Sequence, residues 1–153
     1  MLKRILSVLL ATMIVASATP CVTTSATAHA EIETIYLQDG SYIEIEIIVQ
    51  QSRALNTKTA SKTYNYRGAN GDLQWTGKVT GTFEYNGTTS TCTGASCSVT
   101  ITNTSWYTMS KSASKSGNTA YGYLTMGYDY LGVRIDTENL TMSLTCDQNG
   151  KLS

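Results

Sequence analysis

The sequence predicts an all-β fold, an immunoglobulin-like antiparallel β-sandwich of seven to eight strands, with a small β-barrel as the alternative. Three observations lead to this prediction. Apolar and polar residues alternate with a period of two from Glu31 onward. Turn-forming pairs such as Asp39-Gly40 and Asn86-Gly87 separate the alternating runs. Ten tyrosines, two tryptophans and many threonines supply the residue types that strands favour.

The first thirty residues have the composition of a secretory signal peptide. Lys3 and Arg4 give a positive start, and the apolar stretch 5–18 follows. This stretch is shorter than the roughly 20 residues that a membrane-spanning helix needs, so we expect no membrane span. Cleavage is expected after Ala30, with Ala18 as the alternative. The sequence therefore predicts a secreted protein with a single sandwich domain over residues 31–153.

Cleavage after Ala30 would change the chemistry that the domain can perform. It would remove the only proline and the only histidine, Pro20 and His29, and leave nine basic and eleven acidic side chains. A mildly acidic domain lacks the basic surface that phosphate backbones attract, so nucleic acid is not an expected partner. Without histidine, catalytic arrangements that use an imidazole base are excluded. A non-enzymatic protein is the expectation, and a carboxylate-based hydrolase ranks third among the functions considered.

Three cysteines remain after residue 30, and export makes them disulfide candidates. Cys92 and Cys97 flank a four-residue Thr-Gly-Ala-Ser segment that could close a hairpin, which favours a bridge between them. Cys146 and Cys97 each share the parity of nearby apolar residues, so a bridge that involves Cys146 is the second possibility, and three free thiols are the third. Three thiols without an imidazole do not make a structural zinc site, so no metal and no cofactor are expected.

Individual strands follow from the alternation. In residues 41–50 four branched apolar residues fall on one face, and residues 75–85 carry Trp75, Val79 and Phe83 on one face. Gly77 and Gly81 lie on that same face and indicate close packing or a bulge. The remaining expected strands span residues 58–67, 97–109, 119–130, 131–136 and 139–146, and the tract 110–116 is expected to be a loop.

One surface is predicted to bind a ligand. If residues 98–130 form two strands that turn near Ala113, Val99 lies opposite Tyr128 on the inner face and Trp106 lies opposite Tyr121 on the outer face. Aromatic rings on an outer face can stack on sugar rings or anchor a protein partner. The predicted ligand-binding residues are Trp106, Tyr121, Tyr123, Lys111 and Lys115.

Three segments carry a resemblance to known proteins: Cys92–Ile101 (CTGASCSVTI), Ser110–Ala120 (SKSASKSGNTA) and Leu144–Ser153 (LTCDQNGKLS). They resemble uncharacterised small secreted β-rich proteins of Gram-positive, Firmicutes-type bacteria. That group has no assigned activity, so the resemblance implies export and a bacterial source, and it transfers no functional residue.

Taken with the predicted aromatic surface, these features favour a secreted binding protein whose ligand is an extracellular glycan or a surface protein. The alternative is a structural or self-assembling component of the cell envelope, because threonine-rich strands without proline leave sheet edges open to pairing.

Overall fold

The computed structural model describes residues 32–50 and 56–153, and these residues form eight β-strands. The predicted leader, residues 1–30, and both of its cleavage sites lie outside the described residues. The strands are β1 (Glu33–Tyr36), β2 (Tyr42–Gln50), β3 (Thr57–Arg67), β4 (Leu73–Tyr85), β5 (Ser90–Ile101), β6 (Trp106–Ser116), β7 (Thr119–Tyr130) and β8 (Val133–Thr145).

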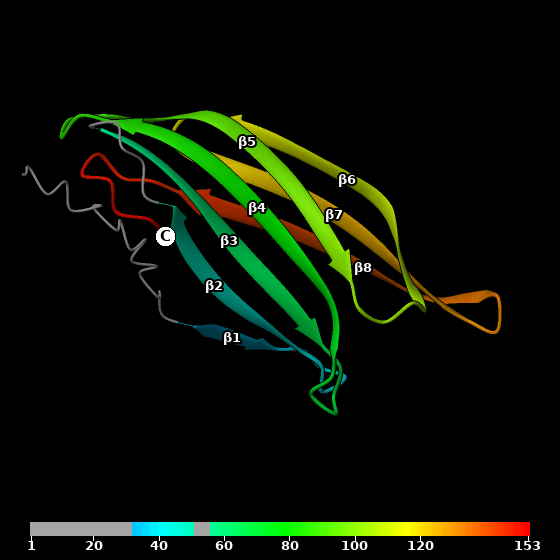
Figure 1. Ribbon diagram of the computed structural model, residues 1–153. Helices are drawn as coiled ribbons and strands as arrows, with labels where there is room; N and C mark the ends of the chain where they lie inside the picture. The colour runs from blue at the N-terminus through cyan, green and yellow to red at the C-terminus, as the bar shows by residue number, and fades with distance from the viewer. Residues whose placement is uncertain (1–31, 51–55) are drawn as a thin grey trace, which may run out of the picture.

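The strands form two antiparallel sheets that pack face to face, with β1 to β5 in one and β6 to β8 in the other (Figure 1). This confirms the predicted all-β sandwich, and the sheets do not close into the barrel considered as the alternative. Within each sheet, every strand pairs with the next one along the chain, and β5 and β6 belong to different sheets. Greek-key connections, which characterise immunoglobulin domains, do not occur among the described strands. The predicted immunoglobulin-like topology is therefore not observed in them.

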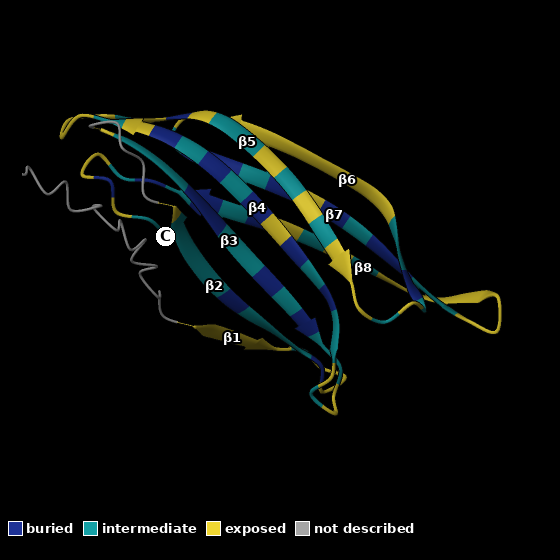
Figure 2. Ribbon diagram, viewed as in Figure 1, coloured by how far each residue is buried: buried dark blue, intermediate teal, exposed yellow. Residues whose placement is uncertain are grey.

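The alternating runs place their apolar residues between the sheets, as predicted for β2, β3 and β4. Tyr66 pairs with Trp75, and both are buried. Gly77 is also buried, and a Cβ atom there would lie 3.2 Å from the Sδ atom of Met142 on the opposite sheet. The predicted close packing at Gly77 is therefore confirmed, and Figure 2 shows the buried positions alternating along β4.

The strand boundaries predicted after residue 90 are partly wrong. β5 ends at Ile101, and the turn 102–105 carries the chain into the second sheet, so the expected strand 97–109 is two strands. The Ser/Lys tract 110–116 belongs to β6 and not to a loop. β8 runs without interruption through residues 136–138, where the sequence predicted a break.

The predicted disulfides are absent, since Cys92, Cys97 and Cys146 are free thiols. Cys92 and Cys97 lie on the same strand, β5, and not on the two arms of a hairpin. Five residues of extended strand separate their Cα atoms by about 17 Å, whereas a disulfide needs less than about 7 Å. Cys146 is buried in the core, and neither of the other two described thiols lies at bonding distance from it.

The part of the chain that the structure describes contains no helix long and apolar enough to cross a membrane.

Candidate functional site at the end of the β7–β8 hairpin

The hairpin that joins β7 to β8 extends past the end of the sandwich. Trp106, the first residue of β6, pairs with Tyr128 of β7. Beyond Tyr128, the hairpin has strand pairings only within itself: Asp129 pairs with Arg134, and Tyr130 pairs with Val133. Figure 1 shows this hairpin, coloured orange, projecting beyond the other strands. The fold therefore presents the end of one hairpin without cover from a neighbouring strand.

The turn at the end of this hairpin has an unusual residue. Tyr130 pairs with Val133, so the loop is the two-residue segment Leu131-Gly132. Both residues have positive φ, 52° for Leu131 and 79° for Gly132. Two-residue turns of this kind favour Asn or Asp at the first position and Gly at the second. The left-handed conformation costs an L-residue such as leucine roughly 1–2 kcal/mol.

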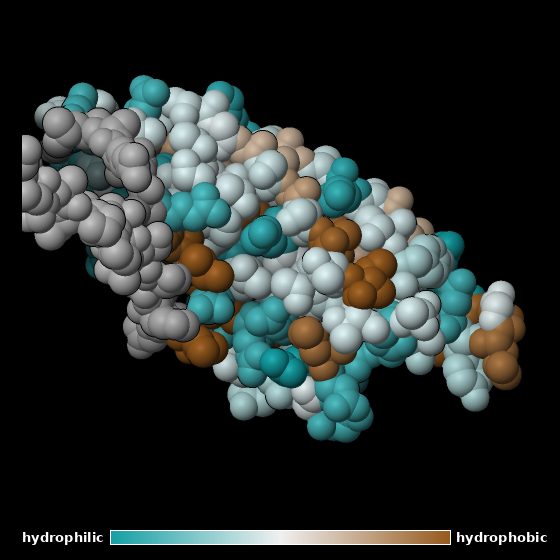
Figure 3. All heavy atoms as spheres, viewed as in Figure 1, coloured by the Kyte–Doolittle hydropathy of each residue, from teal (hydrophilic) through white to brown (hydrophobic). Residues whose placement is uncertain are grey.

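The hairpin end is apolar as well as exposed. Leu131 is 88% exposed, and the flanking large apolar side chains are each more than half exposed: Tyr130, Val133 and Ile135. Apolar atoms gather at this projecting end in the space-filling view (Figure 3). Contiguous exposed apolar side chains are typical of surfaces that contact other molecules. Leu131 contributes neither a relaxed turn nor buried apolar area to the fold.

Contacts with Tyr107 of β6 and with Ser105, just before β6, hold the base of the hairpin in place. The Arg134 Nε–H donates a hydrogen bond of 2.5 Å to the Tyr107 hydroxyl, and the guanidinium lies 5.5 Å from the centre of the Tyr107 ring. That ring covers Gly127, where a Cβ atom would come within 2.5 Å of it. The amide of Asp129 donates to the carbonyl of Ser105 at 2.9 Å. These contacts fix the direction in which the apolar end points.

Acidic side chains surround the base of the hairpin. Glu138 is half-buried on the inner face of β8 opposite Met126. Burial raises the pKa of Glu138, and the negative charges of Asp136 and Asp39 raise it further. One carboxylate oxygen of Asp129 is buried and has no hydrogen-bond partner among the described residues.

The structure separates the residues of the predicted binding surface. Trp106 is only 6% exposed and packs between the sheets, so the prediction that it faces outward is wrong. Tyr121 and Tyr123 do lie on the outer face of β7, where their rings stack with centres 6.4 Å apart. Lys111 and Lys115 pair with inner-face residues of β7 and therefore lie on the other side of β6. The Lys115 ammonium donates a 2.6 Å hydrogen bond to the carbonyl of Thr93 in β5.

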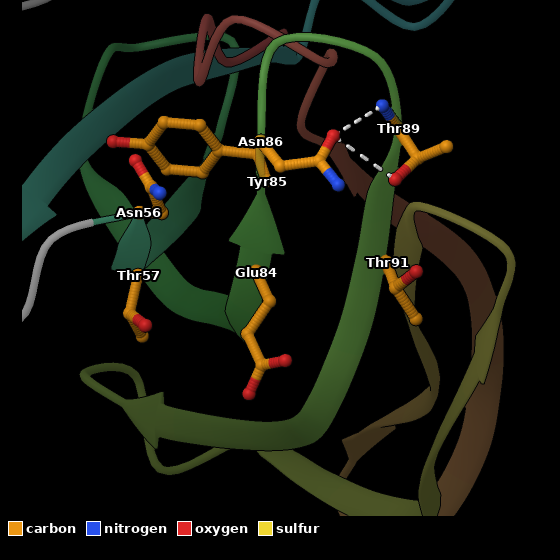
Figure 4. A pocket seen from close by; sticks show the side chains of 7 residues that line it. All are labelled: Asn56, Thr57, Glu84, Tyr85, Asn86, Thr89 and Thr91. Carbon is orange, nitrogen blue, oxygen red and sulfur yellow. Dashed lines mark hydrogen bonds between the residues drawn. The ribbon is translucent and has the colours of Figure 1, made fainter.

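An open polar hollow of about 360 Å³ lies at the opposite end of β4 from Leu73. Figure 4 shows its seven lining side chains, which surround the hollow rather than converge on one point. The Asn86 amide oxygen accepts hydrogen bonds from the Thr89 backbone and hydroxyl groups at 2.8 and 3.2 Å. Glu84 is the single carboxylate in this lining, so the hollow does not supply the acid and base pair of a hydrolase.

No group of three or more metal-ligating side chains is arranged to hold an ion in residues 32–50 and 56–153. The hairpin end offers apolar surface for burial, and at its base Arg134 has further N–H donors and Asp129 has an acceptor oxygen without a partner among the described residues.

Sequence reasoning missed the hairpin end because it treated residues 131–136 as an ordinary strand. The available signal was the Leu-Gly pair between two alternating runs, at a place where Asn-Gly is the favoured turn. Comparison with protein-family models, curated proteins and solved structures finds no match for this chain.

Proposed function

We propose that this protein is exported and works outside the cell as a non-enzymatic binding protein, which inserts its apolar hairpin end into an apolar recess of a protein partner. Export is supported by the leader-like composition of residues 1–30 and by the resemblance to small secreted bacterial proteins. The single observation that carries the binding role is Leu131, 88% exposed and in a backbone conformation that disfavours leucine.

The geometry supports insertion in preference to flat contact. The apolar side chains lie on a narrow two-stranded projection, and burying each of them in a partner would contribute about 1.5–3 kcal/mol. Bracing by Tyr107 and Ser105 holds the projection in one direction before it binds. A preformed projection loses little conformational freedom on binding, which favours affinity.

A second candidate function is glycan binding at the stacked pair Tyr121 and Tyr123. Tyr123 is 41% exposed, and stacked aromatic rings offer flat apolar surface to a sugar ring. The two tyrosines lie on the outer face of β7 and not at the hairpin end. One pair of variants therefore separates the two functions.

The experiment compares the labelled exported chain with Leu131→Asn and with Tyr123→Asn, each titrated onto intact producing cells and onto a panel of glycans. Loss of the apolar contact of Leu131 should weaken binding to cells by about 10- to 100-fold. Tyr123→Asn removes a large exposed side chain that lies away from the hairpin end and should leave this binding unchanged. Equal binding by Leu131→Asn and wild type would refute the proposal, and loss of binding only in Tyr123→Asn would favour the glycan function.

A further inference from the structure

An apolar groove lies where the larger sheet extends past the smaller one. No Cα atom of β1 or β2 lies within 8 Å of a Cα atom in the strands of the second sheet. The inner face of β2 is instead met from one side by the C-terminal segment around Leu152, which leaves an open groove of about 690 Å³. Seven residues line it, of which four are apolar, two are charged and one is a serine: Ile32, Ile45, Ile47, Leu152, Glu33, Lys62 and Ser153.

Lys62 is unusual in its position. It is the inner-face neighbour of Ile47 on one side and of Val79 on the other, so its stem lies among apolar residues. Lys58, the other inner-face lysine of β3, donates to the carbonyl of Gly150 and lies over the Tyr85 ring. Among the described residues, Lys62 and Glu33 form no ion pair with each other or with another side chain. The groove therefore offers one charge of each sign beside an apolar floor.

We infer that the occupant of this groove is the hairpin end of a second copy of the chain. The inference rests on the proposed function, because it names the partner into which the same hairpin end inserts. The two surfaces have complementary shapes, because one is a narrow apolar projection and the other is an open apolar groove on the same molecule. Burying both would remove the exposed apolar surface at Leu131 and at Ile32 together.

The charges of the two surfaces are complementary. The hairpin carries Arg134 and Asp136 close to its apolar end, and the groove carries Glu33 and Lys62 close to its apolar floor. Arg134 uses one N–H on Tyr107, and its guanidinium has further donors for a carboxylate such as Glu33. The negative charge of Asp136 is opposite to the positive charge of Lys62, so these two side chains can form the second ion pair. Opposite charges at corresponding places select one docking direction.

The positions of the two surfaces determine the kind of assembly. The hairpin projects from one end of the molecule, whereas the C-terminus, which borders the groove, lies toward the other end (Figure 1). A contact between different surfaces of identical chains does not close on itself unless the rotation between copies makes a ring. The copies therefore associate head to tail. The contact area is small, so each junction is weak, with a Kd on the order of 0.1 mM.

The experiment is sedimentation velocity of the exported chain from about 10 µM to 1 mM. Wild type should form dimers and longer chains as concentration rises. Leu131→Asn and Ile32→Asn should each remain monomeric, because one loses the projection and the other loses the rim of the groove. Tyr36→Asn is the matched control for the groove. Ile32 lies just before β1, whereas Tyr36 is the last residue of β1, is 76% exposed and is not part of the groove lining, so its variant should associate like wild type.

Mixing the two monomeric variants tests the head-to-tail arrangement. Leu131→Asn keeps its groove and Ile32→Asn keeps its hairpin, so an equal mixture should give one-to-one dimers and nothing longer. Glu33→Arg and Arg134→Glu should each weaken association more than 10-fold alone and recover it when mixed, because the exchanged charges then meet. A symmetric contact between two hairpins would instead let Ile32→Asn dimerise by itself, which would overturn the inference.

A strictly monomeric wild type at 1 mM, or association that Leu131→Asn does not change, would also overturn the inference. The proposed binding function is tested separately, by the binding of the monomer to producing cells. If the monomer still binds producing cells through Leu131, the hairpin end is a binding site whose partner is another protein. If Leu131→Asn changes neither association nor cell binding, both proposals fail.

Discussion

Tyr66 of β3 and Trp75 of β4 stack face to face, with ring centres 5.0 Å apart and planes inclined by 7°. Trp106, from the other sheet, meets both rings edge-on at 5.4 and 6.1 Å. Tyr128 closes the cluster at 5.1 Å from Trp106. Four aromatic side chains thus join the two sheets at the end from which the hairpin projects. The cluster gives the hairpin a rigid base.

Trp106→Ala should therefore act as a core variant and not as a binding variant. Removing a buried tryptophan side chain costs about 3–5 kcal/mol of unfolding free energy, because it leaves a cavity between the sheets. Urea denaturation measures this loss. Tyr123→Ala, in which the removed ring is exposed, should change the unfolding free energy by less than about 1 kcal/mol. Comparable effects of the two variants would contradict the placement of Trp106 in the core.

The same cluster shows how far the sequence predicts the fold. Alternation correctly places Tyr66 and Trp75 on the inner faces of their strands. In a regular strand, whether a residue number is odd or even decides the face on which its side chain lies. The predicted outward orientation of Trp106 is wrong because it depends on a turn near Ala113. The turn occurs instead at Gly117-Asn118, and Trp106 then shares a face with its partner Tyr128.

A register error of this kind follows from the composition of β6. Residues 110–116 are serine, lysine and alanine, so neither face of that stretch is distinctly apolar. A strand without an apolar face fixes its register only weakly from sequence. A bulge between Thr108 and Ser110 shifts the pairing further, and no local signal in the sequence marks it. The hairpin end was missed for a different reason: exposure of Leu131 depends on where β6 begins, which is a tertiary property.

The three thiols should remain reduced in the exported protein and react slowly. Burial raises the pKa of Cys92, of Cys97 and of Cys146, so the reactive thiolate fraction at pH 8 is smaller than for an ordinary cysteine. Alkylation with iodoacetamide, followed by intact mass, should give little product in the native state and full labelling in denaturant without reductant. Cys97, which is partly exposed and lies near the positive charge of Lys111, should be labelled first.

The same mass measurement tests the earlier disulfide hypothesis and the cleavage site. Only one alkylated thiol in denaturant would mean that two of the cysteines are bridged. Cleavage after Ala30 gives at most three labels, whereas cleavage after Ala18 retains Cys21 and allows a fourth.

Glu138→Gln should stabilise the protein at neutral pH and have little effect in acid. The folded state raises the pKa of Glu138, so its ionised form is disfavoured in the fold relative to the unfolded chain. The stability tied to its neutral form is fully present below the unfolded pKa, about 4.3, and is lost as pH rises through the folded pKa. The variant, which never ionises, should therefore have the higher Tm at pH 7 and an equal Tm at pH 3. Glu84→Gln, at an exposed outer-face position, is the control. A lower Tm for Glu138→Gln at pH 7 would show that the carboxylate is stabilising.

Leu131 should show opposite effects on stability and on binding. Asparagine tolerates positive φ better than leucine does, so Leu131→Asn should raise the unfolding free energy by about 1 kcal/mol while it weakens partner binding. Leu131→Ala separates the two roles, because it keeps the Cβ atom that makes positive φ unfavourable and removes the apolar side chain. It should therefore lose binding without a gain in stability. Urea denaturation and sedimentation of both variants give the comparison. If Leu131→Asn instead destabilises the protein, the leucine supports the fold itself, and its exposure would no longer indicate a partner. A gain in stability with a loss of association is the outcome expected of a residue retained for contact with another molecule, because the relaxed turn is one substitution away.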